Sequence, residues 1–324
     1  MQIQEVFDLI KDDIKKVEAG FKKDLNSDVY LISKVGEYIL NSGGKRFRPM
    51  IMLLCARLCN YIGDKHIPLA GVVEFIHTAT LLHDDVVDNA HLRRGNASAN
   101  KVWGDGASIL VGDYLLSKAF SLAVKNGDMR ILSVLSDTTT RMAEGEVLQL
   151  LKHSDADTTE REYLDVVINK TAVLISAASR IAGILGEVSL EKEVALANYG
   201  MGLGTAYQLM DDCLDYTSTD EDLGKSIGND LREGKVTMPL IHASKKSTGA
   251  EKELIRKAVE ADELADSRLQ EIVGIINKYD GIEYTINRAR SYVEESKRNL
   301  ELFEPDIERA ALMAVGDFVI DRTY

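Results

Sequence analysis

The sequence predicts an all-α fold, with residues 1–324 forming a single domain built as a bundle of long helices. Long stretches are rich in Ala, Leu, Ile, Glu and Lys, which favour helix, and they lack the regular turn signals of a sheet protein. Only four prolines occur, and three of them lie beside breaks in the helical pattern. A hydrophobic content of 45% suffices for one large core, and no Pro/Ser-rich linker divides the chain.

Apolar residues at helical spacing locate the helices of the first hundred residues. A helix that contains Val6 and Ile10 comes first, and a second helix ends near Leu40, because two glycines follow at residues 43 and 44. The next helix has Pro49 in its first turn, and a further one runs from about residue 69 to residue 88. Residues 96–100 are expected to form a loop.

The rest of the chain continues as helices, with one exception. Helices are expected to begin near Ala107, Arg130, Thr159 and Leu190, and Thr159 forms a plausible capping box with the glutamate three residues later. Residues 217–235 carry glycines amid charges and predict a long polar loop, and helices resume from residue 236 to the end. The glycines at 200, 202 and 204 favour close helix packing over a nucleotide-binding loop, since no strand precedes them.

Composition limits the partners and the compartment. With 39 basic and 52 acidic residues the formal net charge is −13, which argues against non-specific binding of nucleic acid. Cys55 and Cys59 read as buried thiols, because no second cysteine pair completes a zinc set. Few cysteines, a charged N-terminal segment and no uninterrupted apolar run of ~20 residues predict a soluble cytoplasmic protein.

The strongest chemical signal is the cluster Asp-Asp-Val-Val-Asp at residues 84–88, which ends a long apolar helix. At ~3.6 residues per turn, Asp84 and Asp88 lie on one face, where their carboxylates repel each other. Mg²⁺ relieves this repulsion, because it prefers oxygen ligands and is usually held by one or two carboxylates together with substrate phosphates. The cluster therefore predicts a magnesium site.

The same pattern recurs as Asp-Asp-Cys-Leu-Asp at residues 211–215, which is 127 residues later (211 − 84). If the two helices face each other, their carboxylates form one acidic, magnesium-loaded site. The alternative is a pair of solvated acidic turns. Two copies, each after an apolar helix and accompanied by basic motifs, favour the metal site.

Basic groups accompany the acidic clusters. Residues 43–49, Gly-Gly-Lys-Arg-Phe-Arg-Pro, place three cations at a glycine break before a helix, an arrangement suited to phosphate. Arg93 and Arg94 follow the first cluster closely, and arginine suits bidentate contact with phosphate. Lys170, Lys225 and Lys235 are further candidates in or beside polar turns. A lone lysine is usually a solvated side chain, but the clustering favours diphosphate binding.

Together these motifs closely resemble the trans-isoprenyl diphosphate synthases, or polyprenyl synthetases. The resemblance extends in motifs from about Gly43 to about Leu240 and includes the two aspartate clusters, Lys170-Thr171, Gln208 and Gly224-Lys225. It implies a bundle of long helices around a deep apolar cavity, of the isoprenoid synthase type, and usually a homodimer.

The resemblance also implies residue roles. Three Mg²⁺ ions that bridge the allylic diphosphate would be held by Asp84, Asp85, Asp88, Asp211 and Asp215. That same diphosphate would contact Arg93, Lys170, Lys225 and Lys235, whereas isopentenyl diphosphate would contact Lys45, Arg48, His77 and Arg94. Thr171 and Gln208 would stabilise the developing carbocation with their oxygen dipoles. Of these residues, we expect Asp84, Asp88, Arg93, Lys170, Thr171, Gln208, Asp211 and Lys225 to be catalytic.

The chemistry follows from these roles. Metal and cations neutralise the leaving diphosphate, so that the allylic C–O bond ionises. The isopentenyl double bond then attacks the cation, and a proton is lost, with the released diphosphate as the expected acceptor. A dry cavity protects the cation from water.

Product length is expected to depend on the residues just before the first cluster. In this family, aromatic residues four or five positions upstream close the cavity, whereas here those positions hold the small residues Thr80 and Ala79. The local sequence resembles octaprenyl and decaprenyl synthases that make quinone side chains, such as that of ubiquinone. We therefore expect growth from farnesyl diphosphate to about forty carbons, with decaprenyl, solanesyl or geranylgeranyl diphosphate as alternatives. Transient membrane contact could assist product release.

Three other classes of protein fit the sequence less well. Terpenoid cyclases lack a second matching cluster, and non-catalytic prenyl synthase subunits typically lose the clusters that are intact here. A di-iron carboxylate bundle needs two Glu-x-x-His elements, and only Glu74 to His77 matches. A histidine on an apolar helix is often a satisfied core residue, so His77 is assigned to substrate on the strength of the resemblance.

Overall fold

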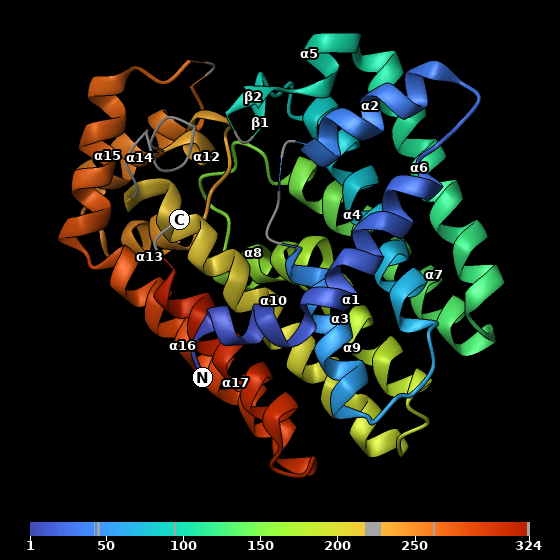
Figure 1. The fold of residues 1–324 in the computed structure, drawn as a ribbon. Coiled ribbons are helices and arrows are strands. Elements are labelled where there is room, and N and C mark those ends of the chain that lie inside the picture. Colours follow the sequence, from blue (N-terminus) through green and yellow to red (C-terminus); the bar gives the residue numbers. More distant parts are fainter. Residues whose placement is uncertain (42, 44–45, 94, 218–227, 262, 323–324) are drawn as a thin grey trace. The chain divides into compact units, whose positions relative to one another are not determined.

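The computed structural model describes residues 1–324 except 42, 44–45, 94, 218–227, 262 and 323–324. Helices dominate the described chain (Figure 1), and its strands there are the short antiparallel pair β1 (Leu92–Arg93) and β2 (Asn96–Ala97). The all-α prediction is therefore confirmed. The helices form two compact units, which interleave in sequence, and the prediction of a single domain stays a prediction.

The first unit comprises Met1–Thr139, Leu174–Gly200 and Lys297–Val315. Its complete helices are α1 (Ile3–Asp24), α2 (Tyr30–Asn41), α3 (Phe47–Leu58), α4 (His66–Val87), α5 (Ala99–Trp103) and α6 (Asp105–Asn126), followed near the C-terminus by the short 3₁₀ turn η2 (Leu300–Leu302). It also contains most of α9 (Val173–Leu185) and the first parts of α7 (Met129–Leu151), α10 (Leu190–Thr217) and α17 (Ile307–Asp321).

Helix α4 is the central element of this unit, packed against α1, α3 and α6. Residues 69–76 are buried without a break, as expected for a helix covered by neighbours on several faces. On α6, a Cβ at Gly112 would lie 2.3 Å from the ring of His83, so glycine permits this close approach of the two helices. The His83 ring nitrogen lies 3.2 Å from the carbonyl of Ile109. Helix α4 is thereby held in register up to the first aspartate cluster.

The second unit comprises Thr140–Val173, Met201–Ser296 and Gly316–Tyr324. Its elements are the end of α7, α8 (Glu160–Val167), the π-helical segment η1 (Ile168–Ala172), the end of α10, α12 (Asn229–Arg232), α13 (Met238–Lys246), α14 (Gly249–Val259), α15 (Asp266–Lys278), most of α16 (Gly281–Asn299) and the end of α17.

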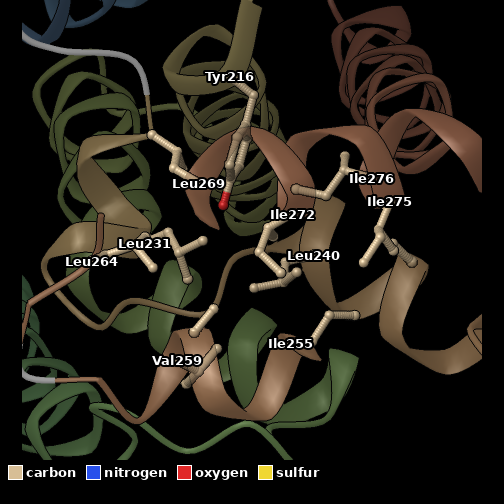
Figure 2. Close-up of a cluster of buried hydrophobic side chains, with 12 residues drawn as sticks. Tyr216, Leu231, Leu240, Ile255, Val259, Leu264, Leu269, Ile272, Ile275 and Ile276 are labelled. Atoms are coloured by element: carbon tan, nitrogen blue, oxygen red, sulfur yellow. The ribbon is translucent and has the colours of Figure 1, made fainter. Parts of the chain in front are cut away.

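A compact apolar core stabilises this unit. Figure 2 shows Leu240, Ile255 and Ile272 among the side chains that converge from α13, α14 and α15. Tyr216, at the end of α10, is also part of this cluster. Burial of aliphatic side chains contributes ~25 cal/mol per Å² of apolar surface, so this core fixes the end of α10 that carries the second aspartate cluster.

Most predicted helices are confirmed, including the capping box in which Thr159 accepts from the backbone of Glu162. Two loop predictions need correction. Residues 96–100 include β2 and the start of α5, because the hairpin pairs Arg93 with Asn96 and leaves no room for a longer loop. The described part of 217–235 contains the short helix α12, because Asp215 bonds to its amino end.

Close helix packing at the glycine repeat is confirmed. A Cβ at Gly200 would lie 2.6 Å from the carbonyl oxygen of Ile175, and one at Gly202 would lie 2.2 Å from the hydroxyl of Ser296. Each glycine therefore allows α10 to approach a neighbouring helix of its own unit. The burial of Cys55 and Cys59 as free thiols is also confirmed, and Cys213 is likewise a buried free thiol.

Two helical stretches are long and apolar enough to cross a membrane when judged by length and composition alone. The stretch Glu160–Leu185 is 67% buried over its most apolar window, which is typical of a core helix in a soluble protein. Helix α6 is only 39% buried over its window, so much of its apolar surface is exposed.

Candidate active site

The first aspartate cluster lies at the carboxyl end of α4, whose residues differ sharply in exposure. His77, Thr80, Asp84 and Asp88 are partly exposed, and their spacing of three, four and four residues places them on one helix face. Ala79, by contrast, is 1% exposed and belongs to the core. The predicted substrate residue His77 and the predicted metal residues Asp84 and Asp88 therefore share a face, and of the two predicted chain-length residues only Thr80 lies on it.

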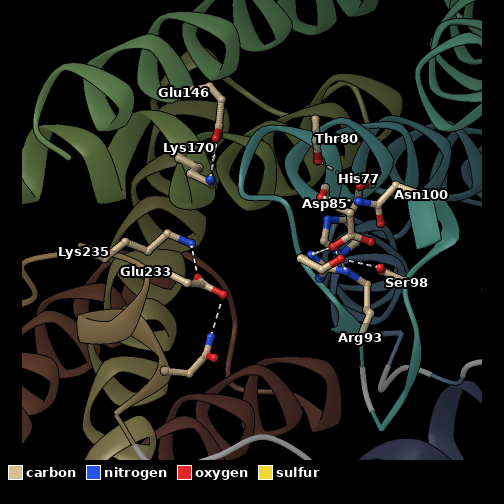
Figure 3. A network of polar contacts seen from close by, with 12 residues as sticks. His77, Thr80, Asp85, Arg93, Ser98, Asn100, Glu146, Lys170, Glu233 and Lys235 are labelled. Atoms are coloured by element: carbon tan, nitrogen blue, oxygen red, sulfur yellow. Dashed lines mark hydrogen bonds and ion pairs between the residues drawn. The ribbon is translucent and has the colours of Figure 1, made fainter. Parts of the chain in front are cut away.

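Asp85, next to Asp84 in sequence, points away from this face into the unit and is bound by Arg93 from the β-hairpin (Figure 3). Its Oδ1 accepts from Nε and Nη2 of Arg93 at 2.7 and 2.6 Å, and its side chain is 3% exposed. The amide of Asn100 donates to the Asp85 carbonyl at 3.0 Å. Gly95, with φ of 77°, supplies the left-handed residue of the hairpin turn that brings Arg93 back. Asp85 and Arg93, predicted for metal and diphosphate, thus form an ion pair.

The structure describes only part of the basic motif at residues 43–49. Lys45, and likewise Arg94, lie outside the described residues, and Arg48 is partly buried in the first turn of α3. Arg46 adopts a left-handed conformation and forms ion pairs with Glu18 and Glu74, both at 3.3 Å. Arg46 therefore ties α3 to α1 and α4, a structural role distinct from phosphate binding.

The second cluster, near the end of α10, repeats the exposure pattern of the first. Asp211 and Asp215 are partly exposed, whereas Asp212 is 2% exposed. In both clusters, then, the first and last carboxylates are accessible and the middle one is buried. One oxygen of Asp215 accepts from the backbone amide of Asp230 at 3.2 Å, which fixes the start of α12.

Asp212 is part of a chain of side-chain hydrogen bonds within the second unit. Thr171 Oγ1 donates to Gln208 Oε1 at 3.1 Å, and Gln208 Nε2 donates to Asp212 Oδ1 at 2.8 Å. The hydroxyl of Tyr163 donates to Asp212 Oδ2. Burial and the nearby carboxylate of Asp230 raise the pKa of Asp212, while the hydrogen bonds from Tyr163 and Gln208 act in the opposite direction. The structure thus brings together Thr171 and Gln208, as the predicted cation-stabilising pair requires.

Lys170 and Thr171 belong to η1, a π-helical segment of the kind that often occurs at functional sites. A Cβ at Gly145 on α7 would lie 2.7 Å from the backbone nitrogen of Lys170, so glycine allows the two backbones to touch. The next residue of α7, Glu146, forms an ion pair with Lys170, in which Oε2 and Nζ are 2.7 Å apart (Figure 3). Helix α7 therefore positions Lys170 through both backbone and side chain.

The remaining predicted cations differ in how much is described. Lys235 forms an ion pair with Glu233 at 2.8 Å (Figure 3). Lys225 lies outside the described residues. The ion pairs with Glu146 and Glu233 orient the ammonium groups of Lys170 and Lys235.

The donor set fits magnesium with a phosphate ligand better than a protein-only metal site. Among the residues that the structure describes, no group of three or more His, Cys, Asp or Glu side chains could hold a metal by itself. Asp84 and Asp88 are accessible carboxylates one helical turn apart. Mg²⁺ is commonly held by one or two carboxylates with substrate phosphates completing its coordination, and these residues match that requirement.

Sequence reasoning missed three residues that contact the predicted site residues. Tyr163 lies beside the apolar residues of α8, and Glu146 lies among several acidic residues of α7, so neither is distinguished by its sequence pattern. Arg322, which forms an ion pair with Asp211, is 111 residues away in sequence (322 − 211). No pattern in the sequence links residues so far apart. Arginine is rarely buried without a charged partner, but its burial is visible only in the structure.

The helical fold, together with the two aspartate-rich motifs in the sequence, is that of an enzyme with the isoprenoid synthase fold. The polyprenyl synthetase family model matches residues 29–276, and the chain belongs to this family of prenyltransferases. It is 42% identical to the octaprenyl diphosphate synthase of Escherichia coli (strain K12) over 322 residues, covering 99% of each chain. It is 37% identical to an all-trans-nonaprenyl-diphosphate synthase of Rhodobacter capsulatus over 320 residues, covering 98% of each.

Solved structures give the same result. A polyprenyl synthase from Caulobacter crescentus CB15, complexed with calcium and isoprenyl diphosphate, has a TM-score of 0.96 and 38% identity, covering 100% of this chain and 98% of that one. A decaprenyl diphosphate synthase from Rhodobacter capsulatus has a TM-score of 0.93 and 37% identity, covering 99% of both. Within its family, the chain is thus of the long-chain polyprenyl diphosphate synthase type.

Proposed function

We propose that the chain is an all-trans octaprenyl diphosphate synthase that extends farnesyl diphosphate with isopentenyl diphosphate to about forty carbons. The observation that carries this proposal is the accessible face of α4, where Thr80, a small residue, stands four positions before Asp84. A growing chain therefore meets no aromatic ring at that position of the helix. Similarity over the full length to octaprenyl diphosphate synthases supports this choice over nonaprenyl or decaprenyl products.

The accessible aspartates of both clusters, Asp84, Asp88, Asp211 and Asp215, are the proposed magnesium ligands, with three ions per site. Asp85 is the fifth candidate, although its Oδ1 is shared with Arg93. When bound, magnesium supplies the positive charge that stabilises the leaving diphosphate. The calcium in the Caulobacter structure shows that a relative binds a divalent cation together with isoprenyl diphosphate.

The basic residues bind the two diphosphates. Arg93, Lys170, Lys225 and Lys235 contact the allylic diphosphate, and Lys45, Arg48, His77 and Arg94 contact isopentenyl diphosphate. Arg93 and Lys170 each pair with a carboxylate, so they are held in place before substrate arrives. Pre-placed cations cost little reorganisation when charge develops on the leaving group.

The hydrocarbon part of the reaction uses different groups. As the allylic C–O bond breaks, positive charge develops on carbon, and the oxygens of Thr171 and Gln208 stabilise it by their dipoles. The isopentenyl double bond forms the new C–C bond, and the proton that leaves is taken up by the released diphosphate. Exclusion of water prevents the cation from being hydrolysed.

A homodimer is the proposed assembly. Helix α6 exposes Ile109, Leu110 and Val124, which are 41%, 69% and 66% accessible. Large exposed apolar surfaces of this kind mark interaction sites, and a second copy of the chain is the proposed partner. We assign the enzyme to the cytoplasm, with transient membrane contact when the long product leaves.

Assay of the purified chain alone, with Mg²⁺, farnesyl diphosphate and labelled isopentenyl diphosphate, tests this function. The expected result is a series of products that ends near forty carbons on reversed-phase chromatography. A non-catalytic subunit gives no product alone but gains activity with a partner. Such subunits deserve a test because two relatives, of 31% and 32% identity, carry names of synthase components.

A further inference from the structure

The hydrogen-bond chain behind Gln208 ends in two residues that have no role in the proposed reaction. Asp212 and Tyr163 are 2% and 6% exposed, and both lie beyond Gln208 when the chain of hydrogen bonds is followed from Thr171. A buried carboxyl group is costly unless it is hydrogen-bonded, and this one is bonded through both oxygens. Because burying this carboxyl group costs free energy, we expect the pair of Asp212 and Tyr163 to have a role.

We infer that Asp212 and Tyr163 are positioning residues that fix the side-chain amide of Gln208 with its oxygen, and not its NH₂ group, beside Thr171. The inference rests on the proposed function, in which those oxygens meet the developing allylic cation. Asp212 is thereby assigned a task different from that of the accessible aspartates in its cluster.

The argument depends on the polarity of an amide group. The two ends of the Gln208 amide have nearly the same shape but opposite charge, so packing alone does not decide between them. In the structure, Asp212 Oδ1 accepts a hydrogen bond from Nε2 of Gln208, and Asp212 Oδ2 accepts one from the hydroxyl of Tyr163. The NH₂ end must therefore point toward Asp212, and the oxygen must point toward Thr171.

The reversed amide would harm both the network and the reaction. It would set the Gln208 oxygen against an oxygen of Asp212 in a buried place, which leaves two acceptors without a donor. It would also present N–H dipoles, positive ends outward, to a carbocation. The hydrogen bond from Tyr163 keeps the Asp212 carboxyl from rotating, so the orientation is fixed at both ends of the chain.

A double-mutant cycle tests the inference. In Asp212→Asn alone, the new amide can keep its oxygen toward Gln208 and donate its NH₂ to the oxygen of Tyr163, so kcat falls less than ~10-fold. In Tyr163→Phe alone, Asp212 still accepts from Gln208, and the loss is similarly small. In the double variant no tyrosine oxygen holds the new amide, so its NH₂ is free to turn toward Gln208 and reverse the Gln208 amide in a fraction of the molecules.

We expect the double variant to lose ~10²–10³-fold in kcat, which is more than the product of the single losses, with KM for isopentenyl diphosphate nearly unchanged. If the two residues only stabilised the fold, the variants would contain less folded enzyme, which circular dichroism measures. The loss of kcat per folded chain in the double variant would then equal the product of the two single losses. Tyr284→Phe is the matched control, because Tyr284 also donates to a carboxylate, Glu160, at 3.0 Å. Its kcat should equal that of the unaltered chain.

A second pair of variants reverses the hydrogen bond and does not depend on the first. Gln208→Glu alone places two carboxyl groups together and should be slow, whereas Gln208→Glu with Asp212→Asn restores a donor facing an acceptor and should recover kcat at least ~10-fold. Multiplicative losses in the cycle together with no recovery here would overturn the inference. An unaltered chain without condensation activity would overturn the proposed function as well, so the two failures are distinguishable.

Discussion

Arg322, close to the end of the chain, forms an ion pair with Asp211 in which Nη1 and Oδ1 are 2.8 Å apart. The arginine side chain is 3% exposed, and its guanidinium carbon lies 3.8 Å from the centre of the Tyr207 ring. It also donates to the backbone carbonyl of Tyr207. A buried arginine held at three points leaves Asp211 few orientations, so Arg322, the residue after α17, limits where a proposed magnesium ligand points.

Replacing Arg322 by methionine should raise the Mg²⁺ concentration needed for half-maximal activity by ~10-fold, because partners of metal ligands typically contribute that much to affinity. The maximal rate at saturating Mg²⁺ should fall less. Arg309→Met is the control, since Arg309 lies on α17, the helix that ends just before Arg322, but donates to the carbonyl of Phe303. An unchanged magnesium titration in Arg322→Met would contradict this role.

Gly145→Ala should destabilise the fold by ~1–3 kcal/mol, because its Cβ would press on the backbone of the π-helical segment, which cannot move like a side chain. Displacing that segment should also lower kcat, since Lys170 lies there. Thermal unfolding measures the first effect. Gly274→Ala, in α15, is the matched control: no atom lies within 4 Å of its Cβ, so it should be neutral or slightly stabilising.

Thr80→Phe should shorten the product without a large loss of stability, because Thr80 lies on the accessible face of α4. Ala79→Phe should also shorten it, but at a cost of ~1–3 kcal/mol, because this buried position has no room for an aromatic ring. Reversed-phase chromatography of the products gives the answer. Ile62→Phe, at a 99% exposed position, should leave product length unchanged. Full-length products from Thr80→Phe would refute the account of chain length.

Acid should weaken the amino end of α8 through Glu162. Its hydrogen bonds with Lys152 and Thr159 lower its pKa from 4.5 to about 2. A lowered folded-state pKa means that the stabilisation is fully present above pH 4.5 and is lost as pH falls toward 2. Glu162→Gln should therefore lower the unfolding temperature at neutral pH and lose that difference near pH 2. An equal deficit at both values would show that the charge is irrelevant.

The fold and most of the candidate site could be predicted from sequence because the signals are local. Helical spacing, the helix start with Pro49 in its first turn and the Thr159 capping box act within a few residues, and each is confirmed. The placement of Asp84 and Asp88 on one helix face follows from the helical repeat alone. The hairpin at Arg93 was missed because two-residue strands have no periodicity to detect.

The contacts that orient the candidate residues could not be predicted in this way. Arg322 meets Asp211, and Tyr163 meets Asp212, only after distant segments have packed together. A sequence pattern likewise does not distinguish the buried middle aspartate of a cluster from its accessible neighbours. That difference depends on which side of the helix the rest of the unit covers.

The central claim, that aspartates of both clusters hold magnesium for one reaction, is tested most directly by the rate of the first condensation as a function of Mg²⁺. Asp84→Asn and Asp211→Asn should each lower this rate by ~10²-fold or more and shift the titration to higher Mg²⁺, because each removes a proposed ligand. Asp137→Asn, an exposed position on α7, is the control. A full rate at unchanged Mg²⁺ in either cluster variant would contradict the claim.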